Sequence, residues 1–252
     1  MSRLLHAEWT KLRTEAAVRW LLPSIVVVTV LVSLLTVAAT SCRREGCGVD
    51  PAAVSLAGVR LGQALVVLLA VLTIGGEQGT GLLRTTFTVA PRRMMVLAAK
   101  AVVIGGLTLA AGTVAVLGCL VAGRAMLPGN GVAPPSLSDG PTLRAAVGSV
   151  LYLVLIGLLA LGVAAAIRDS TASVGAVLAL LYAVPLVAAA INDAELQRTL
   201  RRFAPMTAGL AVQVTTGADD LPIGGWAGLA VLAAWSAASL ICGALLLHHR
   251  DC

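Results

Sequence analysis

The sequence predicts an all-α polytopic membrane protein, and two observations predict it: the composition and the length of the apolar segments. Hydrophobic residues make up 58% of the 252 residues and charged residues only 12%, whereas soluble domains carry about 25% charged residues. The apolar segments are continuous rather than alternating, a pattern that favours membrane helices over the strands of a barrel. The chain is therefore expected to form one domain, 1–252, embedded in a lipid bilayer.

Six segments are long enough for a helix to cross the hydrocarbon core, which takes about 20 residues. They are 20–40, 53–75, 96–122, 144–167, 171–191 and 225–247. Pro185 predicts a kink in the fifth segment, which neighbouring helices tolerate in lipid.

The segment before the first crossing, 2–18, has the pattern of an amphipathic helix. Leu5, Trp9, Leu12 and Ala16 recur every three or four residues and form one stripe, with charged residues on the other faces. Such a stripe favours a helix that lies in the cytoplasmic interface of the membrane. The alternative is a plain cytoplasmic extension of the first crossing.

The basic residues favour a cytoplasmic N-terminus. With the N-terminus inside, ten of the 18 Lys and Arg residues lie in cytoplasmic segments and eight in external ones. Four of the ten precede the first crossing, which usually dominates the orientation. Six crossings then place the C-terminus in the cytoplasm too, so we expect a multi-pass protein of the cell membrane with both termini inside.

Several functional classes lack their sequence signals here. The chain has no G-x-x-x-x-G-K-[ST] motif for nucleotide phosphates and no H-E-x-x-H, and its three histidines all lie near the termini. Few ionisable residues lie near the middle of a crossing, where ion-coupled transporters carry them. The net charge of +6 is not gathered on a Lys/Arg-rich face with aromatic residues. The sequence therefore predicts no enzymatic activity, no bound metal and no nucleic-acid partner.

A polar segment, 77–95, connects the second and third crossings. After Gly81, a short helix would place Leu83 and Phe87 on one face and Arg84 on another, and Pro91 suits the start of the next helix. The segment is thus suited to contact another protein. The alternative is that its basic residues only anchor helix ends to anionic lipid.

Residues of this segment and of the N-terminus resemble a known family. Glu77, Gly79-Thr80, Pro91-Arg92-Arg93, Lys100 and the E-W-x-K-L-R-T of 8–14 resemble the membrane (permease) subunits of type-2 ABC exporters, particularly the small actinobacterial kind. The resemblance covers nearly the whole chain, from the interfacial helix to the long external loop before the sixth crossing.

The resemblance implies a half-transporter that pairs with a second permease chain, identical or related, and with two copies of an ATP-binding subunit. ATP and Mg would bind those subunits, and no cofactor would bind this chain. A cytoplasmic coupling helix in 77–95 would contact the ATPase. The residues expected to carry that contact are Glu77, Arg84, Phe87, Pro91, Arg92 and Arg93. The cargo would be an amphipathic or hydrophobic small molecule, lipid or peptide, such as a drug or natural product. The alternative is a scaffold or sensor subunit that binds a partner protein without transport.

Arg60 and Gln63 are polar residues within the second predicted crossing. Arg60 lies about 10 Å inside it at 1.5 Å per residue, and Gln63 follows three residues later on the same face. One interpretation places both side chains on a substrate path. The other is that the crossing begins later and Arg60 extends to the outer surface.

Two external segments carry further predictions. The loop 192–224 is too long for an ordinary connection, and in 203–217 Met206, Leu210 and Val214 recur every four residues. This spacing predicts a short helix that re-enters the outer leaflet or caps the exit, with a solvated loop as the alternative. Cys42 and Cys47 lie close enough in the first external loop to permit a disulfide without requiring one.

Overall fold

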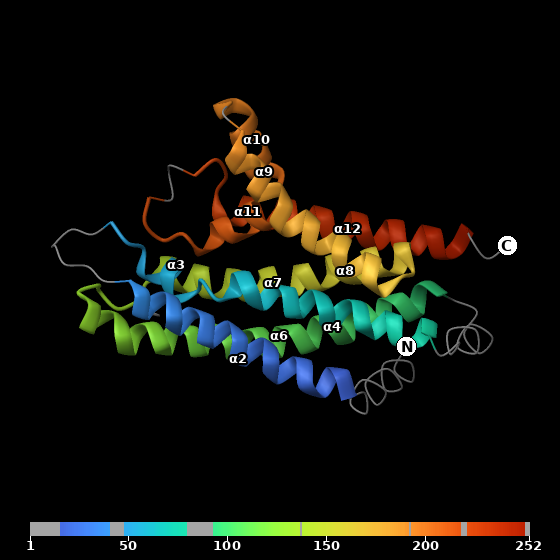
Figure 1. The fold of residues 1–252 in the computed structure, drawn as a ribbon, viewed down its shortest axis with the longest axis horizontal. Helices are drawn as coiled ribbons and strands as arrows, with labels where there is room; N and C mark the ends of the chain where they lie inside the picture. The colour runs from blue at the N-terminus through green and yellow to red at the C-terminus, as the bar shows by residue number, and fades with distance from the viewer. Residues whose placement is uncertain are drawn as a thin grey trace.

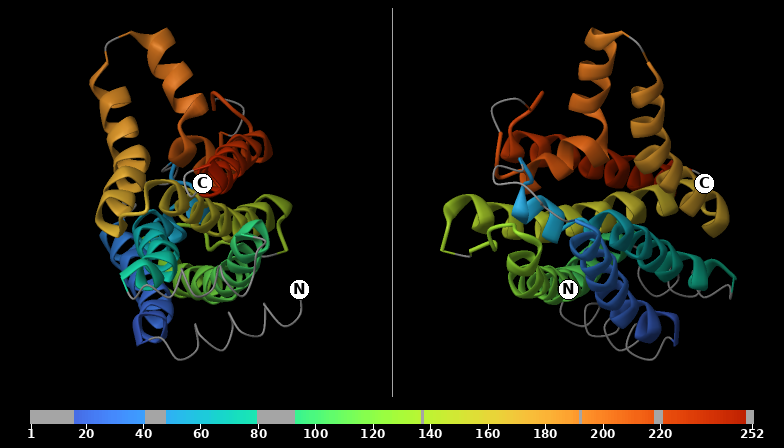
Figure 2. Two further views of the ribbon diagram at one scale, coloured as in Figure 1. Left: turned by 90° about the vertical axis from the view of Figure 1, so that its right-hand side faces the viewer. Right: turned by 60° about the vertical axis from the view of Figure 1, so that its left-hand side comes forward.

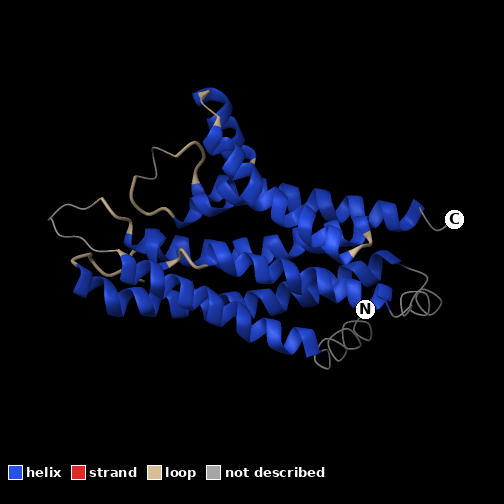
Figure 3. Cartoon of the chain, in the orientation of Figure 1, coloured by secondary structure: helices blue, strands red, loops and turns tan. Residues whose placement is uncertain are grey.

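The computed structural model describes residues 16–40, 48–79, 93–136, 138–191, 193–217 and 221–249. Within these ranges the secondary structure is helical and no strand occurs (Figure 3). The predicted all-α class is confirmed for the part of the chain that is described.

Long helices lie side by side along one axis of the molecule (Figure 1). They are α2 (Ala16–Ala39), α4 (Val59–Gly79), α6 (Arg93–Met126), α7 (Gly140–Ile167) and α12 (Gly225–His249). The consecutive α8 (Ser170–Leu178), π-helix η2 (Ala179–Ala183) and α9 (Val184–Ala190) begin beside these helices and lead obliquely away from them (Figure 1). The start of α2 and the end of α12 lie at one end of the bundle, and the short helix α3 (Pro51–Ser55) lies at the other. We call the latter the α3 end.

Five of these helices, within the described ranges, are long and apolar enough to cross a membrane. They are Ala17–Ala39, Met94–Asn130, Gly140–Ile167, Ser170–Ala190 and Gly225–Leu246. The second predicted crossing corresponds to α4, whose described apolar part, Val59–Gly75, is shorter than these. The structure thus supports a helical membrane protein with five candidate crossings plus this shorter apolar helix.

The predicted start of the second crossing, residue 53, is wrong, because the chain turns before α4 begins. Residues 51–55 form the separate helix α3, and α4 starts only at Val59. At the turn, the backbone N–H of Gly58 donates to Ser33 Oγ at 3.0 Å. A Cβ atom at Gly58 would lie 1.9 Å from the carbonyl oxygen of Thr29, so a residue without a side chain is required.

The core of the bundle is built around α7, which packs against α12, α6 and α4. Its buried residues lie on several faces, among them Tyr152, Ile156, Leu159 and Leu161. On the α12 side the two backbones approach closely: a Cβ at Gly162 would lie 2.5 Å from the backbone nitrogen of Leu240. Small residues allow such packing between membrane helices, where lipid supplies no hydrophobic driving force.

The segment after α9 leaves the bundle and returns to it. A hairpin formed by α9 and α10 (Ala194–Phe203) stands away from the other helices (Figures 1 and 2). Helix α11 (Pro205–Leu210) and the 3₁₀ turn η3 (Ala211–Gln213) then pack against α12 and α7. The π-helix η2 lies directly before the Val184-Pro185 pair, where the sequence predicts a kink, and π-bulges are a known cause of helix distortion.

Candidate functional site

A cluster of polar side chains lies inside the bundle, between α4, α7 and η2. Gln63 of α4 and Tyr152 of α7 are both fully buried. The hydroxyl of Tyr152 donates a hydrogen bond to Gln63 Oε1, and the hydroxyl of Tyr182, in η2, donates to the backbone carbonyl of Arg60. We call Gln63, Tyr152 and Tyr182 the Gln63 cluster.

One polar atom of the Gln63 cluster is not satisfied. The amide of Gln63 lies beside the Tyr182 hydroxyl, yet Gln63 Nε2 is buried and forms no hydrogen bond of acceptable geometry with the described residues. An unsatisfied buried donor costs about 1–3 kcal/mol. Since most buried polar atoms in proteins are paired, this exception marks the cluster as a candidate for function.

The position of Tyr152 along α7 gives the depth of the cluster. Tyr152 lies 12 residues after Gly140 and 15 before Ile167, or about 18 Å and 22 Å from the two helix ends at 1.5 Å per residue. The hydrocarbon core of a bilayer is about 30 Å thick. In a bundle that crosses a bilayer, the Gln63 cluster would therefore lie inside the apolar layer, where polar groups usually face the protein interior and mark pathways.

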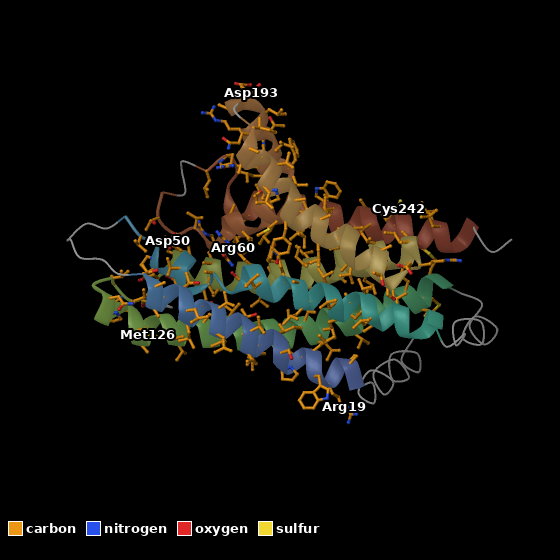
Figure 4. The ribbon with its side chains drawn as sticks, viewed as in Figure 1. Arg19, Asp50, Arg60, Met126, Asp193 and Cys242 are labelled. Atoms are coloured by element: carbon orange, nitrogen blue, oxygen red, sulfur yellow. The ribbon has the colours of Figure 1, made fainter. Side chains whose placement is uncertain are left out.

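The backbone carbonyl of Arg60 accepts from the Tyr182 hydroxyl of the Gln63 cluster, while the Arg60 side chain is exposed. Arg60 is the second residue of α4, and no acidic side chain among the described residues forms an ion pair with it. Figure 4 shows Arg60 in the same half of the bundle as Asp50. The late start of α4 agrees with the interpretation in which Arg60 reaches toward the surface, whereas Gln63, one turn further along, is enclosed.

More polar contacts continue from the cluster toward the α3 end. The amide of Gln213, in η3, donates to Ser149 Oγ at 3.0 Å, and both side chains are buried. Arg144 Nη2 donates to the carbonyl of Val214 at 2.8 Å, while Arg144 Nε is buried with no partner in the described part of the chain. Polar groups thus follow one side of α7 from Tyr152 to its first turns, beneath α11 and η3.

Asp50 ties the two connecting segments of the α3 end together. Its carboxylate accepts from the backbone N–H groups of Ala52 and Ala53 at 3.1 Å, which caps α3. It also accepts from the Thr215 hydroxyl at 2.6 Å and from the backbone N–H groups of Thr215 and Thr216. Burial by itself raises the pKa of Asp50, but these hydrogen bonds outweigh it and hold the pKa below its ordinary value.

Lys100, which the resemblance includes, is buried between helices of the bundle. Only 4% of its surface is exposed, and its Nζ donates to the carbonyl of Thr73 on α4 at 3.4 Å. The lysine therefore joins α6 to α4 within the bundle.

Several predicted site residues lie outside the described ranges. They are Arg84, Phe87, Pro91 and Arg92 of the coupling segment, the pair Cys42 and Cys47, and most of the helix predicted at 2–18. Glu77 and Arg93 lie in α4 and α6, but their side chains are not described. The coupling contact and the disulfide remain predictions.

Sequence reasoning identified Gln63 but missed Tyr152, Tyr182 and Gln213. Gln63 interrupts an apolar run and is therefore conspicuous. A tyrosine in a membrane segment resembles a core residue, and its hydrogen-bond partner on another helix cannot be read from spacing along the chain. The two tyrosines of the protein nevertheless offered a signal, since their hydroxyls need partners when buried.

Known protein families offer no further guide to this site. No family model matches the chain, and no curated protein matches its sequence.

Proposed function

We propose that the chain is the permease subunit of an ATP-driven exporter and that the Gln63 cluster lies on the path of its cargo. The observation that carries the proposal is the unsatisfied amide of Gln63 inside a bundle of apolar helices. A purely structural polar contact would be expected to satisfy all of its donors. A group that binds cargo transiently needs a donor that is free between transport events.

The topology supports an exporter subunit with both termini in the cytoplasm of a cell. The start of α2 and the end of α12 lie at the same end of the bundle (Figure 1), as an even number of crossings requires. Helix α4 also ends and α6 also begins there, so the coupling segment would connect them on the cytoplasmic side. The Gln63 cluster would then lie in the outer half of the membrane, below α11 and η3.

Energy for export would come from partner subunits, because the sequence has no phosphate-binding motif. Two ATP-binding subunits would hold ATP and Mg at the cytoplasmic end, and a second permease chain would complete the path. The cargo would be amphipathic or hydrophobic, since the cluster offers one amide and two hydroxyl groups among apolar side chains. In this proposal the chain itself catalyses no reaction.

The coupling segment provides the first test. Phe87→Ala and Glu77→Gln are expected to leave the chain inserted in the membrane but to lower transport-coupled ATP hydrolysis several-fold. Thr113→Val is a suitable control, because Thr113 is exposed on α6 and its hydroxyl donates within its own helix, to the carbonyl of Leu109. The measurement is ATP hydrolysis by the complex that co-purifies with the full-length chain in lipid nanodiscs. Normal hydrolysis and export in both variants would exclude the coupling role.

The same preparation separates export from a scaffold or sensor role. An exporter subunit is expected to bind an ATP-binding protein and to move a fluorescent amphipathic dye across a vesicle membrane when ATP is supplied. A partner other than an ATPase, together with no dye movement, would favour the scaffold or sensor.

A further inference from the structure

The polar side chains along α7 have more hydrogen-bond donors than acceptors. Within the described part of the chain, the buried side-chain nitrogen and oxygen atoms without a partner are Gln63 Nε2 and Arg144 Nε, and both are donors. The acceptor of the Gln63 amide, Oε1, already accepts from the Tyr152 hydroxyl. A ligand that satisfies these groups must therefore bring acceptors rather than donors.

The guanidinium of Arg60 adds a positive charge beside the Gln63 cluster. Arg60 lies three residues before Gln63 on α4, about 4.5 Å nearer the α3 end, and its charge is close enough to the Tyr152 hydroxyl to act on it. The guanidinium is exposed and forms no hydrogen bond or ion pair within the described ranges. Its five N–H donors can therefore bind an acceptor that approaches the cluster from the α3 end.

A second arginine, Arg144, lies further toward the α3 end and also lacks a carboxylate partner. Arg144 Nη2 donates to the neutral carbonyl of Val214 at 2.8 Å, and no acidic side chain among the described residues forms an ion pair with this guanidinium. Asp50 binds the same connecting segment, but both of its oxygens already accept from N–H and hydroxyl groups. The polar groups on this side of α7 thus include two guanidinium groups that no described carboxylate pairs with.

Two arginines without a carboxylate partner favour a negatively charged ligand. Charged side chains inside the apolar layer of a membrane are costly and usually pair with another group or line a pathway. Arginine binds phosphate and carboxylate groups through two parallel hydrogen bonds, and the same groups would supply the acceptor that the Gln63 amide lacks. A cationic head would be repelled, and a neutral head would leave the charge of Arg60 uncompensated.

We propose that the cargo is an amphiphile with an anionic head, a phosphate or a carboxylate, and that Arg60 and Gln63 Nε2 bind this head. The inference rests on the proposed export function and narrows the class of its cargo. The Tyr182 hydroxyl donates to the Arg60 carbonyl and lies beside the Gln63 amide, so the head displaces this hydroxyl when it reaches Nε2. Tyr182 belongs to the π-helix η2, and π-helical turns are frequent at functional sites.

Competition between amphiphiles of equal chain length tests the charge of the head. The full-length chain is placed in phosphatidylcholine nanodiscs with a dansyl-labelled dodecyl phosphate, and energy transfer from its four tryptophans reports the bound probe. Unlabelled dodecyl phosphate and dodecanoate are expected to displace the probe about tenfold more strongly than dodecanol or dodecyltrimethylammonium. Inorganic phosphate should not displace the probe, because it has no apolar chain.

Substitution of Arg60 tests the residue that carries the charge. Arg60→Gln should weaken binding of the probe about tenfold, the loss expected for a hydrogen bond between charged groups. Arg60→Lys keeps the charge without the paired donors and should recover part of the binding. Arg124→Gln is the matched control and should leave binding unchanged, since Arg124 is an exposed arginine in the last turn of α6.

Four results would overturn the inference. Equal displacement by dodecanol and dodecyl phosphate would show a site without selectivity for the head, and displacement by inorganic phosphate would show a site for free anions. Unchanged binding by Arg60→Gln would remove Arg60 from the site. The absence of displaceable probe would exclude an anionic cargo, whether or not the chain moves the dye of the export test.

The binding assay needs no ATPase, so it fails independently of the export proposal. Selective binding of the anionic amphiphiles by a chain that associates with no ATP-binding protein would support this site and contradict the exporter. If Arg60→Gln does not insert in the membrane, the ranking of the competitors on the parent chain decides.

Discussion

The two sides of α7 differ in how their polar groups are satisfied. On the α12 side, Gly162 lets the backbones meet, and the hydroxyl of Ser236 reaches the carbonyls of Leu155 and Leu232, both at 2.9 Å. On the α4 side, Tyr152 bonds to Gln63, whose amide nitrogen has no completed hydrogen bond within the described structure. The polar group on the closely packed α12 side is hydrogen-bonded, whereas the α4 side holds a buried amide nitrogen without a hydrogen bond in the described structure.

This difference distinguishes two contacts of α7: one that stabilises the fold and one that is a candidate for binding cargo. A closely packed face with paired polar groups has one favoured arrangement and resists change. An unpaired buried amide destabilises the folded protein, and a hydrogen bond from this amide to a ligand would lower the free energy of the complex. The comparison therefore predicts that changes on the α12 side affect folding, while changes on the α4 side affect transport more than folding.

The largest effect on stability is expected at Gly162. Gly162→Ala would place a Cβ 2.5 Å from the backbone nitrogen of Leu240, so α7 and α12 must separate, at a cost of about 3 kcal/mol. Gly106→Ala is the matched control, since a Cβ there meets no atom of the described residues within 4 Å and alanine favours the helix. Thermal unfolding in detergent measures both. Equal melting temperatures for the two variants would show that α7 and α12 are not in close contact.

A smaller loss is expected for Tyr152→Phe, which leaves Gln63 Oε1 without its donor. A buried group deprived of its partner costs about 1–3 kcal/mol, whereas replacing both partners by apolar groups can be nearly neutral. The double variant Gln63→Leu with Tyr152→Phe should therefore be more stable than Tyr152→Phe alone. The same unfolding experiment tests this order. A double variant less stable than the single one would mean that the hydrogen bond is mainly structural.

The smallest effect is expected at Asp50, outside the compared faces. The lowered pKa of Asp50 means that its contribution is present above its ordinary value of 3.8 and is lost as the pH falls through the lowered, folded-state value. Asp50→Asn replaces one accepting oxygen by an NH₂ group that cannot accept from Thr215 or Thr216, so it should lower stability by about 1 kcal/mol near neutral pH. It should also weaken the dependence of the melting temperature on pH below about pH 4. An unchanged acid dependence in the variant would show that other carboxyl groups are responsible.

The helical class and most crossings could be predicted from the sequence, because long apolar runs determine them locally. The start of α4 could not, since it depends on Ser33 of another helix bonding to Gly58. Helix α10 was also missed: its arginines gave the segment the composition of a loop, although Asp193 and the spacing of Leu196, Leu200 and Phe203 carried a helical signal.

The candidate site was only partly predictable for the same reason. Gln63 was identified as a polar residue in an apolar run, but its partner Tyr152 lies 89 residues away along the chain. Arg60 was grouped with Gln63 because of their spacing, yet the structure encloses only Gln63 and leaves the Arg60 side chain exposed. Local patterns indicate which residues are unusual, while tertiary contacts determine which of them meet.

The most direct test of the central claim is ATP-dependent movement of an amphipathic dye by the full-length chain reconstituted with the ATP-binding protein that co-purifies with it. The parent chain is expected to move the dye. The double variant Gln63→Leu with Tyr152→Phe should keep its fold and its bound ATPase but lose about tenfold or more in dye movement, the equivalent of one or two lost hydrogen bonds to the cargo. Equal dye movement by the double variant would contradict the assignment of the Gln63 cluster to the path. Failure of any ATP-binding protein to associate would contradict the exporter itself.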